Sequence, residues 1–282
     1  MSTEIDDRRQ LLLRQRLAGA RRSRAAVPRL DLSAELPLSF GQRRLWFLDR
    51  YDGTATDNLV PIVLGLTGAL DAAALGRAWD RLVRRQQVLR THYRSTGGEP
   101  VQWIAPDGPR LELTDLGAAD DPEQAAAELA ERLAARPLPL AEGAAARIHL
   151  LRLAADRHVL VAVFHHIAFD GWSESVFWSE LSAFYREETG AGPALLPELP
   201  VQYAEYAAWQ RQRFDDGRMA AATAYWTDRL AGVTPLELPA DRPRPDVRGP
   251  ASGPAGSPSP RSRPTPSAHS PWSTAPPRSP CC

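Results

Sequence analysis

The sequence predicts a mixed α/β fold, an α+β sandwich in which a mixed sheet is flanked by helices. Strand-like and helix-like segments alternate from Leu36 onward, which is typical of mixed folds. No repeat period appears along the chain, and this excludes a solenoid. Hydrophobic residues make up 43% of the 282 residues, enough to build a substantial core.

The individual elements follow from hydrophobic periodicity and from capping residues. Strands are expected where aliphatic and aromatic residues cluster, at 59–66, 89–94, 101–104, 148–153 and 159–164. Helices are expected from a Ser39 cap through Leu48, after an Asp71 cap, over 122–136, after a Ser173 cap, and over 201–214 and 219–230.

The helix after Asp71 gives the clearest helical pattern in the chain. Its apolar residues recur at spacings of three and four, at Leu75, Ala78, Trp79, Leu82 and Val83. This spacing places them on one face, so we expect that face to be buried.

The two ends of the chain differ from the middle. Residues 1–32 are expected to form an amphipathic helix and a linker, either a solvated lead-in or a docking element for another protein. Residues 246–282 are rich in Pro, Ser and Arg and cannot build a core, so a disordered tail is expected. A shifted reading frame is one hypothesis for this tail. The folded domain is expected at 33–245.

Composition excludes several classes of function. The formal net charge is zero, so no overall field favours nucleic acid or an anionic membrane as a partner. No run of 18 apolar residues and no signal peptide appear, and a cytoplasmic location is expected. The two cysteines, Cys281 and Cys282, are adjacent and lack the spacing of a metal site, so no metal is expected.

One short segment combines residues that can carry chemistry. The apolar run 159–164 ends in His165 and His166, and Asp170 and Gly171 follow after a short loop. A residue at the end of a buried strand is held rigidly, and Gly171 permits close approach of a substrate to the backbone. The amides that open the next helix are candidates to face an oxyanion. Taken singly, however, a histidine at a strand end is more often structural, and Asp-Gly is more often a turn.

Taken together, residues 165–173 resemble the HHxxxDGxS motif of condensation domains of nonribosomal peptide synthetases, within the chloramphenicol-acetyltransferase-like acyltransferases. Four flanking segments resemble further motifs of that family, in the same order: 39–48 (SxAQxRLWxL), 85–91 (RHExLRT), 203–209 (YxDYAxW) and 238–245 (LPTDRPRP). The chain departs from these patterns at Gly41, Gln86, Gln87 and Glu205. The resemblance covers about 36–245.

The resemblance implies the amino-terminal lobe of a two-lobed enzyme that forms amide bonds. Its substrates would be an acyl or peptidyl thioester and an aminoacyl thioester, carried on the 4′-phosphopantetheine of peptidyl or acyl carrier proteins, its partners in the synthetase. No cofactor would be bound directly. The motifs of the second lobe are missing, so we expect this chain alone to be inactive and leave open whether it acts as an enzyme.

The resemblance also assigns roles to residues. His166 is expected to position the substrates and act as base, and His165 is expected to be structural. Asp170 is expected to be architectural, paired with Arg90 or with an arginine of the first motif, and Gly171 belongs to the same site. Further support of the site is expected from the first motif, at Gln42, Arg43 and Trp46.

Alternatives of other classes stay open. An epimerization domain also carries HHxxxDG, and so does an acyltransferase that uses coenzyme A. The segments 203–209 and 238–245 favour condensation over both. Heterocyclization is disfavoured because those domains replace the histidines. A scaffold that binds carrier proteins without chemistry is the third hypothesis.

Overall fold

The computed structural model describes residues 27, 29–31, 33–52, 56–215, 217–236 and 239. The chain divides into two compact units, Met1–Arg229 and Leu230–Cys282. All helices and strands that the structure describes lie in the first unit. The amphipathic helix expected within residues 1–32 and the tail expected at 246–282 lie outside the described residues.

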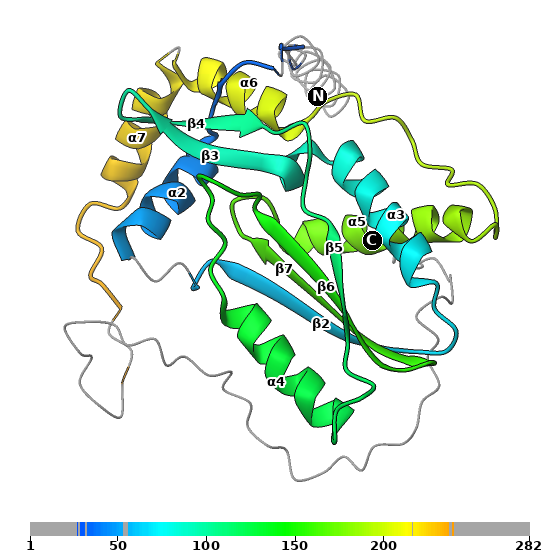
Figure 1. Ribbon diagram of the computed structural model, residues 1–282. Helices are drawn as coiled ribbons and strands as arrows, with labels where there is room; N and C mark the ends of the chain where they lie inside the picture. Colours follow the sequence, from blue (N-terminus) through cyan, green and yellow to red (C-terminus); the bar gives the residue numbers. More distant parts are fainter. Residues whose placement is uncertain are drawn as a thin grey trace, which may run out of the picture. The chain divides into compact units, whose positions relative to one another are not determined.

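A four-stranded mixed sheet is the centre of the first unit. Its strands run in the order β2 (Leu59–Thr67), β7 (Arg157–His165), β6 (Ala146–Ala154) and β5 (Leu111–Asp115). The first three pair antiparallel, and β5 pairs parallel with β6 at the edge. The prediction of a mixed sheet is confirmed (Figure 1).

Two helices, α3 (Ala72–Arg85) and α5 (Gly171–Glu188), cover one face of this sheet (Figure 1). The apolar stripe predicted for α3 is buried, and Trp79 at its middle is 0% exposed. Leu160 and Phe164 of β7 join the same cluster. This packing fixes the first turn of α5 close to the end of β7.

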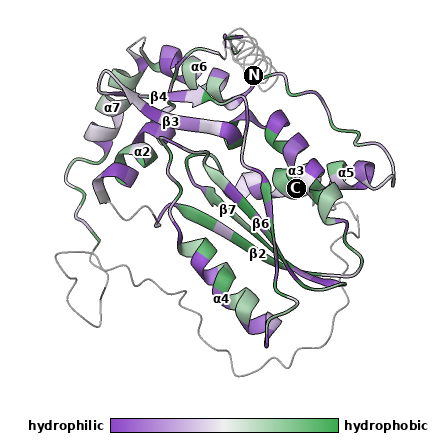
Figure 2. Cartoon of the chain, viewed as in Figure 1, coloured by the Kyte–Doolittle hydropathy of each residue, from purple (hydrophilic) through white to green (hydrophobic). Residues whose placement is uncertain are grey.

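The helix α4 (Pro122–Ala135) covers the opposite face of the sheet. Val161 and Val163 of β7 pack there with Ala126 and Ala130 of α4. Successive side chains of β7 therefore alternate between the two cores, as the pleat of a strand requires. Both faces of β7 are covered, which explains its nearly continuous apolar sequence (Figure 2).

A second, smaller sheet holds three antiparallel strands in the order β1 (Leu36–Pro37), β4 (Glu99–Ile104) and β3 (Thr91–Thr96). The helix α6 (Tyr203–Asp215) contacts β1 and the helix α2 (Phe40–Asp52). After α6 comes α7, Arg218–Arg229, in which no residue is buried.

Salt bridges reinforce the packing of α3 on α5. Three arginines spaced four residues apart on α3 face three glutamates on α5, and the N–O distances are 2.7 to 3.1 Å. The pairs are Arg77–Glu188, Arg81–Glu187, Arg81–Glu188 and Arg85–Glu180. A regular spacing of four keeps all three arginines on one side of α3.

The structure differs from the sequence predictions in several details. Residues 87–90 form a 3₁₀ helix, η1, so the strand expected at 89–94 begins only at Thr91. The strand β5 was not predicted, because its five residues at the edge are mostly exposed and partly polar. Ser173 does not cap α5, because Asp170 occupies that position. The predicted cap at Ser39 is confirmed, since its hydroxyl accepts the Gln42 N–H at 3.1 Å.

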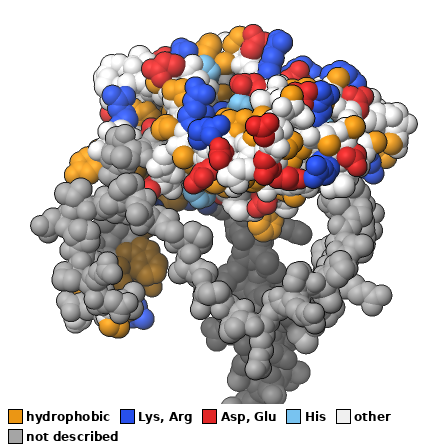
Figure 3. Space-filling model, turned by 60° about the horizontal axis from the view of Figure 1, so that its bottom comes forward, with side chains coloured by type: hydrophobic (Ala, Val, Ile, Leu, Met, Phe, Trp, Pro, Cys, Tyr) orange, Lys and Arg blue, Asp and Glu red, His pale blue; other side chains and the backbone are white. Residues whose placement is uncertain are grey.

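Among the described residues, no helix is long and apolar enough to cross a membrane. On the face shown in Figure 3, acidic, basic and hydrophobic side chains are interspersed among the coloured residues. This mixture agrees with the zero formal net charge of the sequence.

Candidate active site

The end of β7 is held firmly on both sides. Leu59 of β2 lies opposite His165, and His165 N–H donates to the Ala145 carbonyl at 2.9 Å. His166 N–H donates to the Asn58 carbonyl at 2.7 Å. Because successive side chains diverge, His165 is 0% exposed whereas His166 is exposed.

The buried imidazole of His165 connects α2 to the loop that carries His166. Its Nδ1 accepts the Ile167 N–H at 3.0 Å, and its Nε2 lies 3.3 Å from Asp49 Oδ1. An N–H donor requires an unprotonated Nδ1, so the ring hydrogen sits on Nε2 and points at Asp49. His165 is therefore a neutral, doubly anchored ring.

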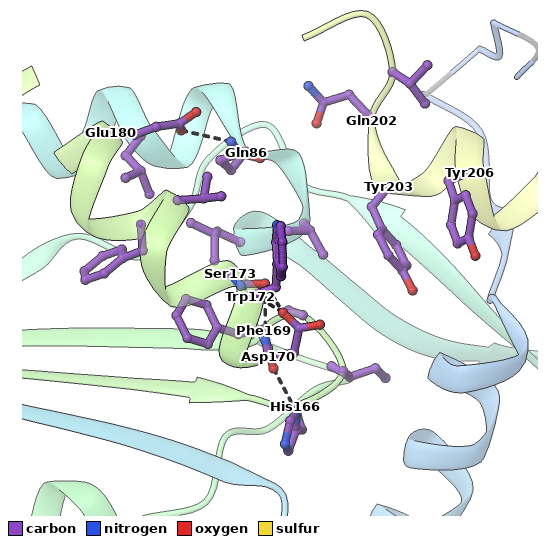
Figure 4. Close-up of a pocket in the computed structure, with 18 residues that line it drawn as sticks. Gln86, His166, Phe169, Asp170, Trp172, Ser173, Glu180, Gln202, Tyr203 and Tyr206 are labelled. Atoms are coloured by element: carbon purple, nitrogen blue, oxygen red, sulfur yellow. Dashed lines mark hydrogen bonds between the residues drawn. The ribbon is translucent and has the colours of Figure 1, made fainter. Parts of the chain in front are cut away.

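The exposed imidazole of His166 has the opposite tautomer. Its Nδ1 lies 2.9 Å from the Phe169 carbonyl (Figure 4). A carbonyl oxygen only accepts, so Nδ1 carries the hydrogen, and Nε2 of the neutral ring keeps its lone pair. Of the two adjacent histidines, only His166 combines exposure with a proton-accepting nitrogen.

Asp170 caps α5 and takes no part in a buried ion pair. Its Oδ1 accepts from the Ser173 N–H at 2.9 Å and from the Ser173 hydroxyl at 2.7 Å, while the Asp170 N–H donates to that hydroxyl at 3.2 Å. The hydrogen bonds from the Ser173 side chain and backbone hold the pKa of Asp170 below its usual value. Asp170 thus fixes where α5 begins.

The expected pairing of Asp170 with an arginine was wrong. Arg90 donates to the Ala105 carbonyl instead, and Arg43 of the first motif pairs with Glu99 at 3.3 Å, where both side chains are largely exposed. The carboxylate of Asp170 is satisfied within its own helical turn, so it needs no distant cation.

Gly171 is the first residue of α5. A Cβ atom placed on it would meet nothing within 4 Å, and its φ is not positive. Neither backbone strain nor crowding within the chain therefore requires glycine here. The Ser173 N–H donates to the Asp170 carboxylate at 2.9 Å, so this amide is already occupied within the chain.

The three residues expected from the first motif stand apart from His166. Gln42 is 2% exposed, accepts the Ser39 N–H at 3.0 Å and donates to the Tyr93 hydroxyl at 3.2 Å. Trp46 packs against the cluster that contains Ile167. None of Gln42, Arg43, Trp46 and Arg90 lines the pocket that His166 lines.

That pocket has a volume of about 410 Å³. The loop after β7, the first turns of α5, the end of α3 with η1, and residues 201–206 form its walls. His166 lies toward one end, and Gln86 and Glu180 lie at another, with Trp172 between them (Figure 4). Pockets of this size hold small molecules or parts of larger ones.

Sequence reasoning missed two residues that the structure brings into the site. Glu180 lies in the buried stripe of α5, three residues after Phe177 and next to Leu181. A carboxylate in such a stripe signals a buried ion pair. Asp49 gave no comparable signal, because its contact with His165 spans 116 residues.

Among the described residues, no group of three or more His, Cys, Asp or Glu side chains is arranged to hold a metal ion. Cys281 and Cys282, which are not expected to bind metal, lie outside the described residues.

Residues 33–251 match the family model of the condensation domain. This range covers more than half of the chain. The chain belongs to the condensation-domain family. The resemblance predicted from the sequence is therefore confirmed. The chain is a condensation domain of the type found in nonribosomal peptide synthetases.

Curated relatives of this condensation domain are much longer proteins. The chain is 44% identical over 224 residues to chondramide synthase cmdD of Chondromyces crocatus, a match that covers 78% of this chain and 6% of the synthase. It is 42% identical over 242 residues to phosphinothricin tripeptide synthetase PhsC of Streptomyces viridochromogenes, covering 83% and 22%. The isonitrile lipopeptide synthase of Mycobacterium tuberculosis is 41% identical over 228 residues, covering 76% and 9%.

Solved structures support the fold. The X-domain of teicoplanin biosynthesis, solved with OxyB, gives a TM-score of 0.66 at 29% identity and covers 80% of this chain and 50% of that chain. The first condensation domain of the calcium-dependent antibiotic synthetase gives 0.61 at 25%, covering 72% and 49%. The starter condensation domain of rhizomide synthetase gives 0.65 at 18%, covering 72% and 49%. The chain thus spans about half the length of these chains.

Proposed function

We propose that this condensation domain supplies the His166-bearing half of a chamber that joins two thioester substrates through an amide bond. The substrates would be an acyl or peptidyl thioester and an aminoacyl thioester, each carried on the 4′-phosphopantetheine of a carrier protein. The chain itself would bind no cofactor. The observation that carries the proposal is His166, an exposed imidazole with its proton-accepting Nε2 fixed by the bond from Nδ1 to Phe169, at the edge of a pocket.

The reaction needs a base at a late stage. The amine nitrogen attacks the thioester carbon, the C–N bond forms, and the C–S bond breaks to release a thiol. An α-amine with a pKa of about 7.7–8.0 is already roughly a tenth neutral at pH 7, so deprotonating it beforehand contributes only about 1.4 kcal/mol. His166 Nε2 would instead take the proton from the ammonium of the tetrahedral intermediate and return it to the departing sulfur.

Positioning would contribute more than proton transfer. Holding amine and thioester in line can lower the barrier by about 7–11 kcal/mol. In this proposal His165 and Asp49 anchor the loop of His166, Asp170 fixes the first turn of α5, and Gly171 leaves the approach to that turn open. Asp170 therefore acts through structure and does not touch the reacting atoms.

A second lobe would complete the chamber. Solved relatives are about twice as long as the part that this chain matches, and the pocket beside His166 is bounded here by this lobe alone. Residues 33–245 would form the amino-terminal lobe. Without a partner lobe, amine and thioester are not held in line, so the chain alone should not turn over.

A condensation assay tests the proposal. The chain is incubated with an acyl-loaded and an aminoacyl-loaded carrier protein, alone and with the separately expressed carboxyl-terminal half of a solved relative, and the amide is measured by mass spectrometry. Amide should form only with the added half and should fall by roughly 100-fold or more in His166→Ala. His92→Ala, a change in the other sheet, serves as the control. Equal rates with His166→Ala would refute the proposal.

A binding scaffold without chemistry is the second candidate. The observation that favours it is the relationship to the teicoplanin X-domain, whose structure is a complex with OxyB. Saturable binding of loaded carrier proteins, with no amide under any condition, would support the scaffold. Racemised aminoacyl product would instead indicate epimerization, and acyl transfer from a coenzyme A thioester would indicate an acyltransferase that uses coenzyme A.

A further inference from the structure

The pocket beside His166 has both apolar and polar lining. Its apolar residues include Val88, Leu89, Val176 and Phe177. Phe177 and Leu89 are 4% exposed, so their positions are set by the core behind them. A substrate group placed here loses water contacts and gains apolar ones.

The far end of the pocket is polar and organised around one buried carboxylate. Glu180 is 6% exposed and lies on α5 among apolar residues. Its Oε1 accepts from Arg85 Nε at 2.9 Å, and its Oε2 accepts from Gln86 Nε2 at 2.9 Å. Gln86 and Glu180 line the pocket (Figure 4), whereas Arg85 does not.

This arrangement favours one kind of ligand group. Each carboxylate oxygen can accept two hydrogen bonds, so Glu180 can accept another bond from a neutral donor. A ligand group that ends in an anion would be repelled by Glu180, and one that ends in a cation would compete with Arg85 for the same carboxylate. A neutral donor such as a phenol or an alcohol avoids both penalties.

The position of Gln86 in the sequence agrees with a role in selection. Gln86 is one of the positions where the chain departs from the RHExLRT pattern of the second motif. Its amide holds Oε2 of Glu180 in place. The polar end of the pocket thus depends on Gln86 and Glu180 of this chain.

We infer that this pocket selects substrates whose side chain has an apolar body and a neutral hydrogen-bond donor at its tip, with Glu180 as the acceptor. The inference rests on the proposed function, because it takes the group bound next to His166 to be part of a thioester substrate. A phenol side chain fits this description, with its ring against the apolar lining of the pocket and its hydroxyl toward Glu180.

Four ligands of nearly equal size test the inference. They are amide analogues of aminoacyl-pantetheine whose side chains are phenylalanine with a para hydroxyl, hydrogen, carboxylate or aminomethyl group. Calorimetry on the full chain should show the hydroxyl analogue binding about fivefold more tightly than the hydrogen analogue. Both charged analogues should bind more weakly than the hydrogen analogue.

The variant Glu180→Gln should reverse this order. It removes the negative charge and leaves Arg85 near the pocket end, so the carboxylate analogue should gain at least about fivefold and the preference for the hydroxyl should disappear. If Glu180→Gln fails to fold, Val176→Trp places a large ring on the pocket lining and should weaken all four ligands. Val63→Trp, at an exposed position on β2, is its matched control and should change nothing.

The outcomes separate the inference from the proposed function. Equal binding of the hydroxyl and hydrogen analogues, both weakened by Val176→Trp, would overturn the inference while the pocket remains a substrate site. Binding that ignores Val176→Trp, or no binding of any analogue to the folded chain, would overturn the inference together with the assignment of this pocket to substrate.

Discussion

The Nδ1–H of His166 donates to the backbone carbonyl of Phe169 at 2.9 Å. The loop from His166 to Phe169 thus determines which nitrogen of His166 can act as a base. The adjacent His165 uses its Nδ1 in the opposite sense, as an acceptor for the Ile167 N–H. Two neighbouring histidines of one motif are therefore held in different tautomers, one buried and one exposed.

Removing the partner of the buried ring should loosen this loop. Asp49→Ala leaves Nε2–H of His165 without its acceptor in a site where the ring is 0% exposed. We expect the free energy of unfolding to fall by about 1–3 kcal/mol, measured by urea denaturation. Asp115→Ala, which breaks an exposed pair with Arg152, should cost less than about 1 kcal/mol. Equal costs for the two variants would contradict the anchoring role.

Asp170 should behave as a helix cap. Asp170→Ala should lower the free energy of unfolding by about 1 kcal/mol, and Asp170→Ser should restore most of it. Combining Asp170→Ala with Arg90→Ala should give additive losses, because Arg90 donates elsewhere. A coupling energy above about 1 kcal/mol in this double-mutant cycle would indicate an ion pair between Asp170 and Arg90, contrary to the structure.

The same carboxylate predicts a response to acid. Its hydrogen bonds to Ser173 lower the pKa of Asp170 in the folded chain. Its stabilising effect is therefore fully present above the unfolded pKa of about 3.9 and is lost as the pH falls through the lower folded value. Asp170→Ser should make stability less sensitive to pH in that acidic range than in the unaltered chain, as followed by urea denaturation at several pH values.

His149 should make the fold sensitive to pH at a higher range. Burial, together with Arg147 and Arg136, lowers the pKa of His149, although Glu112 opposes this effect, and its Nε2 has no hydrogen-bond partner. The unfolded chain then binds a proton first, so stability is full above about pH 6.5 and falls as the pH drops below it.

The variant His149→Leu tests this dependence. It should flatten the loss of stability between about pH 6.5 and pH 5, where His149 would titrate in the unfolded chain. An unchanged slope in His149→Leu would show that another group controls this range.

Gly108 should resist substitution for a steric reason. A Cβ atom at this position would collide with Val83 Cγ1 and lie 3.1 Å from Arg90 Cβ. Because Val83 is buried and stiff at χ1, Gly108→Ala should cost about 1–3 kcal/mol of stability. The same change in a Val83→Ala background should cost clearly less, as measured by urea denaturation. Equal costs in both backgrounds would contradict the clash.

Local patterns predicted the fold well where they were strong. The stripe on α3 and the buried run of β7 were found because one period or one apolar run defines each of them. The edge strand β5 has only five residues and is mostly exposed, so no such signal existed. The cap of α5 was misplaced by three residues, because Asp170 and Ser173 are both good caps and they bond to each other.

Long-range contacts in the site could not be predicted. The pair Gln86–Glu180 spans 94 residues and His165–Asp49 spans 116, and only the packing of α3 on α5 and of α2 beside the motif loop brings them together. The motif identified His165 and His166 but not which nitrogen each presents. That depends on backbone groups at Ile167 and Phe169, which the sequence letters do not encode.

The tautomers of the two histidines test the central claim most directly. Nitrogen-15 NMR of the imidazoles at neutral pH, assigned with His166→Ala, distinguishes protonated from unprotonated ring nitrogens. The structure predicts a hydrogen on Nε2 of His165 and on Nδ1 of His166, so that Nε2 of His166 is an unprotonated, basic nitrogen. A hydrogen on Nε2 of neutral His166 would contradict the account, because the exposed histidine would then present no proton acceptor to a substrate.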